Sequence, residues 1–265
     1  MAPHCFFVPF CATLWKTNIQ EDNPMTMEEM QRLLERQQSR TDIMNLMGRY
    51  QYYHTGGQMS RIGRELFAWW LPDARCEYGP LGVFGAKKSL EFFDAMTELF
   101  TGGTGACHPG LLEIHQITTP VLEVAEDNQT AKGMWMSTGA ILMLHDEGAE
   151  EGRSFTWDSG KYAVDFIRTE QGWRVWHLHV CDLWRTDFDR DPVANAAPMD
   201  RGTTQEMIDE WNARAAAGET VHPHGMPIIP DGPTTFHYAY ASDSIAPQQP
   251  EPPLPYRTFC ETFEY

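Results

Sequence analysis

The sequence predicts an α+β fold in which N-terminal helices cover one face of a curved antiparallel sheet. Helical periodicity dominates residues 27–100, and strand-like segments rich in Val, Ile, Phe, Tyr and Trp follow each other from residue 110 to 184. A tight turn at residues 170–172 joins the last two of these segments. Helices followed by a run of strands are typical of folds whose helices pack on one side of a sheet.

Three helices are predicted before the main strands. The first spans residues 27–53 and is ended by Gly56 and Gly57. Others are expected at residues 60–71 and 86–100, with a short strand at residues 75–78 between them. The face of the first helix that repeats at helical spacing consists of Ile43, Met47, Tyr50 and His54.

Four long strands and three chain segments complete the predicted organisation. The strands are expected at residues 110–126, 130–144, 154–169 and 173–184. We assign residues 25–190 to one domain, residues 1–24 to an N-terminal extension, and residues 191–265 to a C-terminal helix and arm.

The C-terminal part differs in composition from the domain. A helix is predicted over residues 203–217, opened by a capping box of Thr203 and Glu206. Half of the 18 prolines follow it, between Pro223 and Pro255. A disordered tail is one interpretation of such a segment. Its aromatic side chains instead favour an ordered arm that wraps the domain or a partner subunit.

Charge and cysteine usage limit the classes of partner. The formal net charge of −17 disfavours nucleic acid and anionic membranes as partners. No apolar run reaches membrane-spanning length. The six cysteines lack the C-x-x-C spacing of metal or redox sites, so we expect free thiols in a reducing cytoplasm.

Nucleotide, flavin and metalloprotease motifs are absent from the sequence. His177 and His179 lie on one side of a predicted strand, but no carboxylate or third histidine lies at recognisable ligand spacing, so we predict no metal. The chemistry that remains is cofactor-free acid–base catalysis by histidine, tyrosine, aspartate and lysine.

Several segments together resemble the SnoaL-like family of the NTF2-like superfamily. They are residues 115–131, the hairpin of residues 161–177, Arg49-Tyr50 at a helix end, and residues 71–74 before a short strand. The resemblance covers about residues 27–185. It implies a cone-shaped α+β barrel with one deep pocket, and a homodimer or homotrimer.

Within that superfamily the chain is similar to cofactor-free dehydratases of the scytalone dehydratase type. The resemblance places His115 at the position of their active-site histidine and Tyr78 at that of a pocket tyrosine. Their helix-end Tyr-Asp pair is replaced by His54-Thr55, with Tyr50 and Tyr53 adjacent. The resemblance thus implies catalytic roles for His115, Tyr78, His54, Tyr53 and Tyr50.

The expected substrate is a small aromatic molecule, because the candidate pocket is rich in aromatic residues. We expect the following residues to bind it: Tyr162, Trp135, Trp157, Trp69, His108 and Lys161. For Lys161 the alternative is an ion pair with Asp165 on the face that points away from the pocket. Trp135 lies in a Met-Trp-Met segment, which we expect to form an apolar wall.

Lignin-dimer diarylpropane lyases, which convert a diarylpropane-1,3-diol to a stilbene and formaldehyde, are similar to this chain in size, C-terminal arm and helix-end tyrosines. A dehydratase, a hydratase and a polyketide-cyclase-like enzyme remain alternatives. A ketosteroid-isomerase type is less favoured because no carboxylate is recognisable as its base. A non-catalytic ligand-binding or assembly module is the alternative of another class.

Overall fold

The computed structural model describes residues 24–144, 153–187, 191, 193, 202–236, 240, 245 and 249–260. The extension predicted for residues 1–24 therefore lies outside the described residues, except for Pro24. Six strands form one sheet in the order β2-β1-β6-β5-β4-β3. Their bounds are Arg75–Tyr78 (β1), Val83–Gly85 (β2), Leu112–Val124 (β3), Thr130–Leu144 (β4), Arg153–Thr169 (β5) and Gly172–Asp187 (β6).

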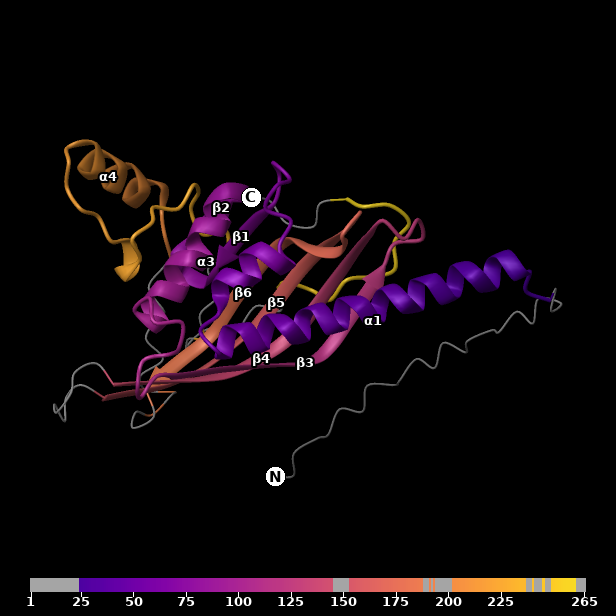
Figure 1. Ribbon diagram of the computed structural model, residues 1–265, viewed down its shortest axis with the longest axis horizontal. Coiled ribbons are helices and arrows are strands. Elements are labelled where there is room, and N and C mark those ends of the chain that lie inside the picture. The colour runs from indigo at the N-terminus through magenta and orange to yellow at the C-terminus, as the bar shows by residue number, and fades with distance from the viewer. Residues whose placement is uncertain are drawn as a thin grey trace, which may run out of the picture.

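The predicted α+β class and the antiparallel meander β3-β4-β5-β6 are confirmed. Two features of the sheet differ from expectation. β1 pairs with β6 in parallel, and the short strand β2, which the sequence pattern missed, pairs with β1. Because β2 and β3 are the two ends of the strand order, the sheet is curved but open and does not close into a barrel (Figure 1).

Helices cover one face of the sheet, which we call the inner face (Figure 1). α1 spans Met27–Thr55 and begins with a capping box of Thr26 and Glu29, and α3 spans Ala86–Thr101. The helix predicted at residues 60–71 is shorter: α2, Met59–Arg61, continues as a π-helical turn, Ile62–Leu66. It stops there because Phe67 bridges to Val175 of β6 and leaves the helical path.

The core lies between these helices and the inner face of the sheet. The predicted buried face of α1 is confirmed, since Ile43, Met47, Tyr50 and His54 are all buried. Residues of the strands that pack against the helices include Trp135, Tyr162 and Phe166. Gly133 lies two residues before Trp135, and its missing side chain leaves room for the tryptophan ring.

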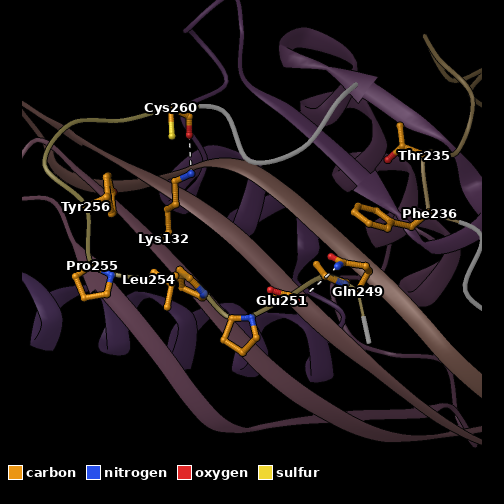
Figure 2. A pocket seen from close by; sticks show the side chains of 12 residues that line it. Lys132, Thr235, Phe236, Gln249, Glu251, Leu254, Pro255, Tyr256 and Cys260 are labelled. Carbon is orange, nitrogen blue, oxygen red and sulfur yellow. Dashed lines mark hydrogen bonds between the residues drawn. The ribbon is translucent and has the colours of Figure 1, made fainter. Parts of the chain in front are cut away.

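Residues 249–260 of the predicted arm pack against the outer face of the same sheet. Lys132 Nζ donates to the Cys260 carbonyl at 2.6 Å, Lys161 Nζ donates to the Pro250 carbonyl at 3.1 Å, and Tyr256 Oη donates to Thr130 Oγ1 at 3.1 Å. A cavity of about 630 Å³ lies between this arm and the sheet (Figure 2). Tyr238, Phe263 and Tyr265, which also favoured an ordered arm, lie outside the described residues.

α4 spans Gln205–Ala216 and lies at one end of the molecule, away from the sheet (Figure 1). The predicted capping box at Thr203 is wrong by one residue, because Thr204 is the N-cap and its Oγ1 accepts from Met207 N at 3.2 Å. Thr203 is buried instead, and its hydroxyl lies 3.0 Å from the Pro80 carbonyl. A short 3₁₀ turn, Pro223–Gly225, follows α4. No helix in the described ranges is long and apolar enough to cross a bilayer.

Candidate active site

Four strands place one row of residues side by side on the inner face. His115 of β3 lies opposite Gly139 of β4, which lies opposite Asp158 of β5, which in turn lies opposite Arg185 of β6. Because Gly139 has no side chain, the His115 ring and the Asp158 carboxylate meet above it, and a Cβ there would lie less than 3.0 Å from each. The register therefore brings together groups that are far apart in the sequence.

His115 lies between two carboxylates in this row. Its Nε2 is 3.2 Å from Glu113 Oε1, and its Nδ1 is 3.4 Å from Asp158 Oδ1. Burial lowers the pKa of His115, but the hydrogen bond to Glu113 and the charge of Asp158 outweigh it, so the pKa lies above its ordinary value. Arg185 Nη2 approaches Asp158 Oδ2 at 3.5 Å, and its half-exposed side chain marks where the cluster reaches solvent.

His54 and Tyr78 bring α1 and β1 to the same cluster. His54 Nε2 forms a hydrogen bond of 2.7 Å with Tyr78 Oη and lies 3.7 Å from Glu113 Oε1. The His54 and His115 rings meet edge to face, with 4.9 Å between their centroids. Burial lowers the pKa of His54 to about 4, so this imidazole is neutral at pH 7, whereas the environment of His115 favours the charged form.

Aromatic side chains form the wall behind the histidines. Tyr50 packs edge to face on Tyr162 at 5.8 Å between centroids, and Tyr162 lies opposite Trp135 across β4 and β5. Burial raises the pKa of both tyrosines, so their hydroxyls stay protonated. Tyr50 Oη and Trp135 Nε1 are buried without a hydrogen-bond partner among the described residues.

A further carboxylate, Asp182, completes the cluster from β6. It lies opposite Gly160 on the same inner face and close to Gly79, whose missing side chain gives it room. Burial raises the pKa of Asp182 to about 6, an effect that Arg185 partly offsets and Asp158 strengthens. This carboxyl therefore changes its charge close to neutral pH.

Six of the predicted site residues converge in this cluster: His115, Tyr78, His54, Tyr50, Tyr162 and Trp135. The flanking Met134 and Met136 lie on the outer face, so only Trp135 of the predicted apolar wall points inward. Along β4, the next residue on the inner face after Trp135 is Ser137.

The other five predicted site residues lie elsewhere. Tyr53 forms hydrogen bonds with Glu65 and Arg61 at the surface, at 2.9 and 2.8 Å. Three are exposed or partly exposed, namely His108, Trp69 and Trp157, and Trp157 lies on the outer face beside inward-facing Asp158. Lys161 also lies on the outer face, where it donates to the arm.

The expected ion pair between Lys161 and Asp165 is replaced by other contacts. Asp165 instead pairs with His177, whose Nδ1 lies 2.9 Å from Asp165 Oδ2. His179 pairs with Glu77 in the same way, at 3.0 Å. All four members of these two pairs are buried on the outer face, away from the His54–His115 cluster.

Sequence reasoning missed the three carboxylates of the site, Glu113, Asp158 and Asp182. The structure thus places carboxylates in the cluster, although none was recognisable as a base from the sequence. Glu113 could have been found, because residues two apart on a strand share a face, and it precedes His115 by two. The other two depend on strand register and bulges between distant segments, which local patterns do not reveal.

The arrangement can supply both an acid and a base to one small molecule. The charged form of His115 can donate a proton, and neutral His54 can accept one directly or through Tyr78. A metal is the other possibility that the donor atoms allow, because one atom each of His54, Glu113 and His115 lie within 4.8 Å of one another. This group does not include His177 or His179, the two histidines that were considered as metal ligands from the sequence.

Comparison with known proteins gives a family and a set of similar structures. The SnoaL-like domain model matches residues 35–179 of the 265. No curated protein matches the chain. A hexachlorocyclohexane dehydrochlorinase from Novosphingobium barchaimii has 17% identity and a TM-score of 0.45, over 60% of this chain and 95% of that one.

Two further solved structures show the same level of similarity. A scytalone-dehydratase-like protein from Novosphingobium aromaticivorans has 14% identity and a TM-score of 0.43, over 65% of this chain and 99% of that one. An NTF2-like superfamily protein from Salmonella enterica has 16% identity and a TM-score of 0.42, over 55% and 92%.

Proposed function

We propose that this chain, which belongs to the SnoaL-like domain family, is a cofactor-independent lyase that removes water from a hydroxylated aromatic small molecule. One observation carries the proposal. Buried His54 and partly buried His115, whose pKa values are shifted in opposite directions, lie 4.9 Å apart, ring centroid to ring centroid. Groups whose environments push their pKa values apart are suited to act as an acid and a base in one reaction.

The two histidines take different roles in this proposal. His115, held between Glu113 and Asp158, donates a proton to the hydroxyl that leaves as water. His54 accepts a proton from the substrate, and its hydrogen bond with Tyr78 lets the tyrosine hydroxyl relay it. Steps of this kind contribute about 10²–10⁴-fold each to the rate.

We further propose a diarylpropane-1,3-diol as the substrate. Protonation of its benzylic hydroxyl releases water and gives a quinone methide once a base takes the phenol proton. Removal of the proton from the terminal hydroxyl then breaks the carbon–carbon bond, so that formaldehyde and a stilbene form and the atoms balance. The aromatic wall of Tyr50, Tyr162 and Trp135 supports a substrate with aromatic rings.

Removal of the proton from the terminal hydroxyl needs a base. Lys161 and Tyr53 do not belong to the cluster, so neither is proposed as the base. We propose Asp182 as this base, because it lies on the inner face. Its pKa of about 6 leaves the carboxyl ionised at pH 7 and is close to the range suited to proton transfer.

The test is incubation of the metal-stripped protein with an erythro diarylpropane-1,3-diol, with stilbene absorbance and formaldehyde as readouts. We expect both products from the wild type and from the exposed-loop control His108→Ala, and a loss of at least 10²-fold for His115→Ala. A folded wild-type protein that forms neither product rejects this substrate. Activity retained by folded His115→Ala rejects the proposed acid.

A second candidate, a dehydratase or isomerase acting on another ring substrate, is favoured by the same Asp182. A partly buried carboxyl with a raised pKa can serve as the base that removes a proton next to a carbonyl. Hydroxylated polyketides and ketosteroids are the substrates to test. Exchange of a substrate C–H proton for deuterium from the solvent, absent in Asp182→Asn, would support this candidate over the diol.

A further inference from the structure

Three side chains of the cluster meet in an arrangement suited to a divalent metal ion. His54 Nε2 and His115 Nε2 both point at one carboxylate oxygen, Glu113 Oε1, at 3.7 and 3.2 Å. We infer that His54, Glu113 and His115 form a binding site for Zn²⁺. Two histidines and one glutamate are a known donor set for zinc, with the fourth position left open.

The spacing of the donor atoms fits this ion. Zinc binds histidine nitrogens and carboxylate oxygens at about 2.0–2.2 Å, which puts neighbouring donors of a tetrahedral site roughly 3.3–3.6 Å apart. Two of the three separations, 3.2 and 3.7 Å, lie close to that range, and all three are within 4.8 Å. The three donor atoms come from α1 and β3, so folding rather than local sequence assembles the site.

The surroundings of His115 support the inference independently of the donor set. Its second nitrogen, Nδ1, lies 3.4 Å from Asp158 Oδ1, and Arg185 approaches the other oxygen of Asp158. Histidines that bind metals commonly donate their second N–H to a carboxylate, which fixes the ring and its tautomer. Here that contact directs Nε2 of His115 toward Glu113.

One oxygen of the Glu113 carboxylate also lacks a hydrogen-bond donor. The side chain is buried, with 8% of the residue exposed, and its Oε2 has no hydrogen-bond partner among the described residues. A buried carboxylate oxygen without a donor is costly. A divalent cation at Oε1 would compensate the charge of this group and of Asp158 beside it.

Zinc and the proposed acid–base reaction would exclude each other. The ion needs the lone pairs of both histidines, so it replaces Tyr78 as the partner of His54 Nε2 and leaves neither ring able to transfer a proton. This consequence rests on the proposed function and makes zinc an inhibitor. The binding itself does not depend on that function.

The experiment is a titration of the chelator-treated, full-length protein with Zn²⁺ against a chromophoric chelator, followed by Co²⁺ substitution and visible absorption. We expect one tight site with tetrahedral Co²⁺ bands. Its affinity should fall at least 100-fold in His54→Asn and Glu113→Gln, and about 10–100-fold in Asp158→Asn, which only orients His115. His222→Ala, which removes an exposed histidine, should leave the affinity unchanged.

Circular dichroism confirms that each variant is folded before its titration is interpreted. The inference is overturned if the wild type binds no zinc, or if folded His54→Asn and Glu113→Gln bind it as tightly as the wild type, because the ion then lies elsewhere, for example on exposed thiols. Tight binding without any turnover of the diol would support the metal site while rejecting the proposed substrate.

Discussion

At the scale of single residues, Gly139 decides whether the site can form. Its missing side chain lets His115 and Asp158 approach each other across β4. We predict that Gly139→Ala forces the two groups apart and reduces activity at least 10-fold, while overpacking lowers the free energy of unfolding by about 1–3 kcal/mol. Steady-state kinetics and urea denaturation measure the two effects.

The matched control for that variant is Gly48→Ala in α1, where nothing lies within 4 Å of the added Cβ. In a helix this change should raise stability by about 0.5–1 kcal/mol and leave activity unaltered. Equal losses in both alanine variants would contradict the role assigned to Gly139.

Asp182 is the residue whose ionisation should be visible in stability. Its pKa rises from 3.8 to about 6 on folding, so the folded chain binds the proton more tightly than the unfolded chain between those pH values. The contribution of Asp182 to the free energy of unfolding is therefore greatest below pH 3.8 and falls as the pH rises toward 6. Asp182→Asn removes the penalty and should stabilise the protein by up to about 3 kcal/mol at pH 7.5, with little effect at pH 4.

Denaturant unfolding of both proteins at the two pH values measures this difference. Asp42→Asn, at an exposed position of α1, is the control and should show the same small change at both pH values. A stabilisation by Asp182→Asn that is no larger at pH 7.5 than at pH 4 would show that folding does not raise the pKa of this carboxyl.

At the scale of elements, β1 connects the arm to the site. Glu77 accepts hydrogen bonds from Thr235 N at 2.6 Å, Thr235 Oγ1 at 2.5 Å and Phe236 N at 3.2 Å on the outer face. The next residue, Tyr78, points inward to His54. In β1, Glu77 thus anchors residues 235–236 on the outer face, and the adjacent Tyr78 contacts His54 on the inner face.

We predict that Glu77→Gln loosens this segment, because a neutral amide replaces the charged acceptor of several buried donors. The expected loss in free energy of unfolding is about 2–3 kcal/mol. Faster hydrogen exchange at residues 234–236 reports the local effect. Glu251→Gln, at an exposed position of the arm, should change stability by less than about 0.5 kcal/mol, and hydrogen exchange unaffected by Glu77→Gln would rule out the anchor.

At the scale of the whole molecule, the arm acts as a second layer over the outer face of the sheet. Phe259 packs on Trp176 at 4.7 Å between ring centroids, and Tyr256 bonds to Thr130. We predict that removing residues 249–265 lowers the free energy of unfolding by about 3 kcal/mol, and the melting temperature by roughly 6–12 °C. Differential scanning calorimetry measures the shift; an unchanged melting temperature would show that the arm adds no stability.

The predicted homodimer or homotrimer stays a prediction. The first turns of α1 project beyond the sheet (Figure 1), and their exposed side chains include Met27, Met30 and Leu34 at helical spacing. Such a stripe is compatible with a contact between subunits, and light scattering on the intact protein measures the mass directly.

Much of the fold could be predicted because its elements carry local signals. The face of α1 from Ile43 to His54 repeats at helical spacing, and the strands from residue 112 to 187 are long and bounded by turns. The two errors in the predicted elements have different causes, one a long-range contact and the other a short strand. Phe67 leaves the second helix to bridge to β6, and β2 has only three residues, too few for a recognisable period.

The candidate site was only partly predictable. His115, Tyr78 and His54 follow from the family resemblance, and their convergence agrees with it. Trp157 was misplaced because, on a strand, a shift of one residue reverses the face on which a side chain lies, whereas for Lys161 the alternative of a face that points away from the pocket agrees with the structure. Tyr53 was misplaced for the related reason that neighbouring residues of a helix point in different directions.

By itself, then, the sequence determined the class of fold, the order of its elements and the family, because periodicity and short motifs are properties of neighbouring residues. Only the tertiary structure decided which carboxylates surround His115. Glu113, Asp158 and Asp182 come from three strands, and they meet through the sheet register, its bulges and the empty position of Gly139. Burial lowers the pKa of His54, whereas the carboxylates beside His115 raise the pKa of that ring, so the surroundings rather than the residue type separate the two histidines.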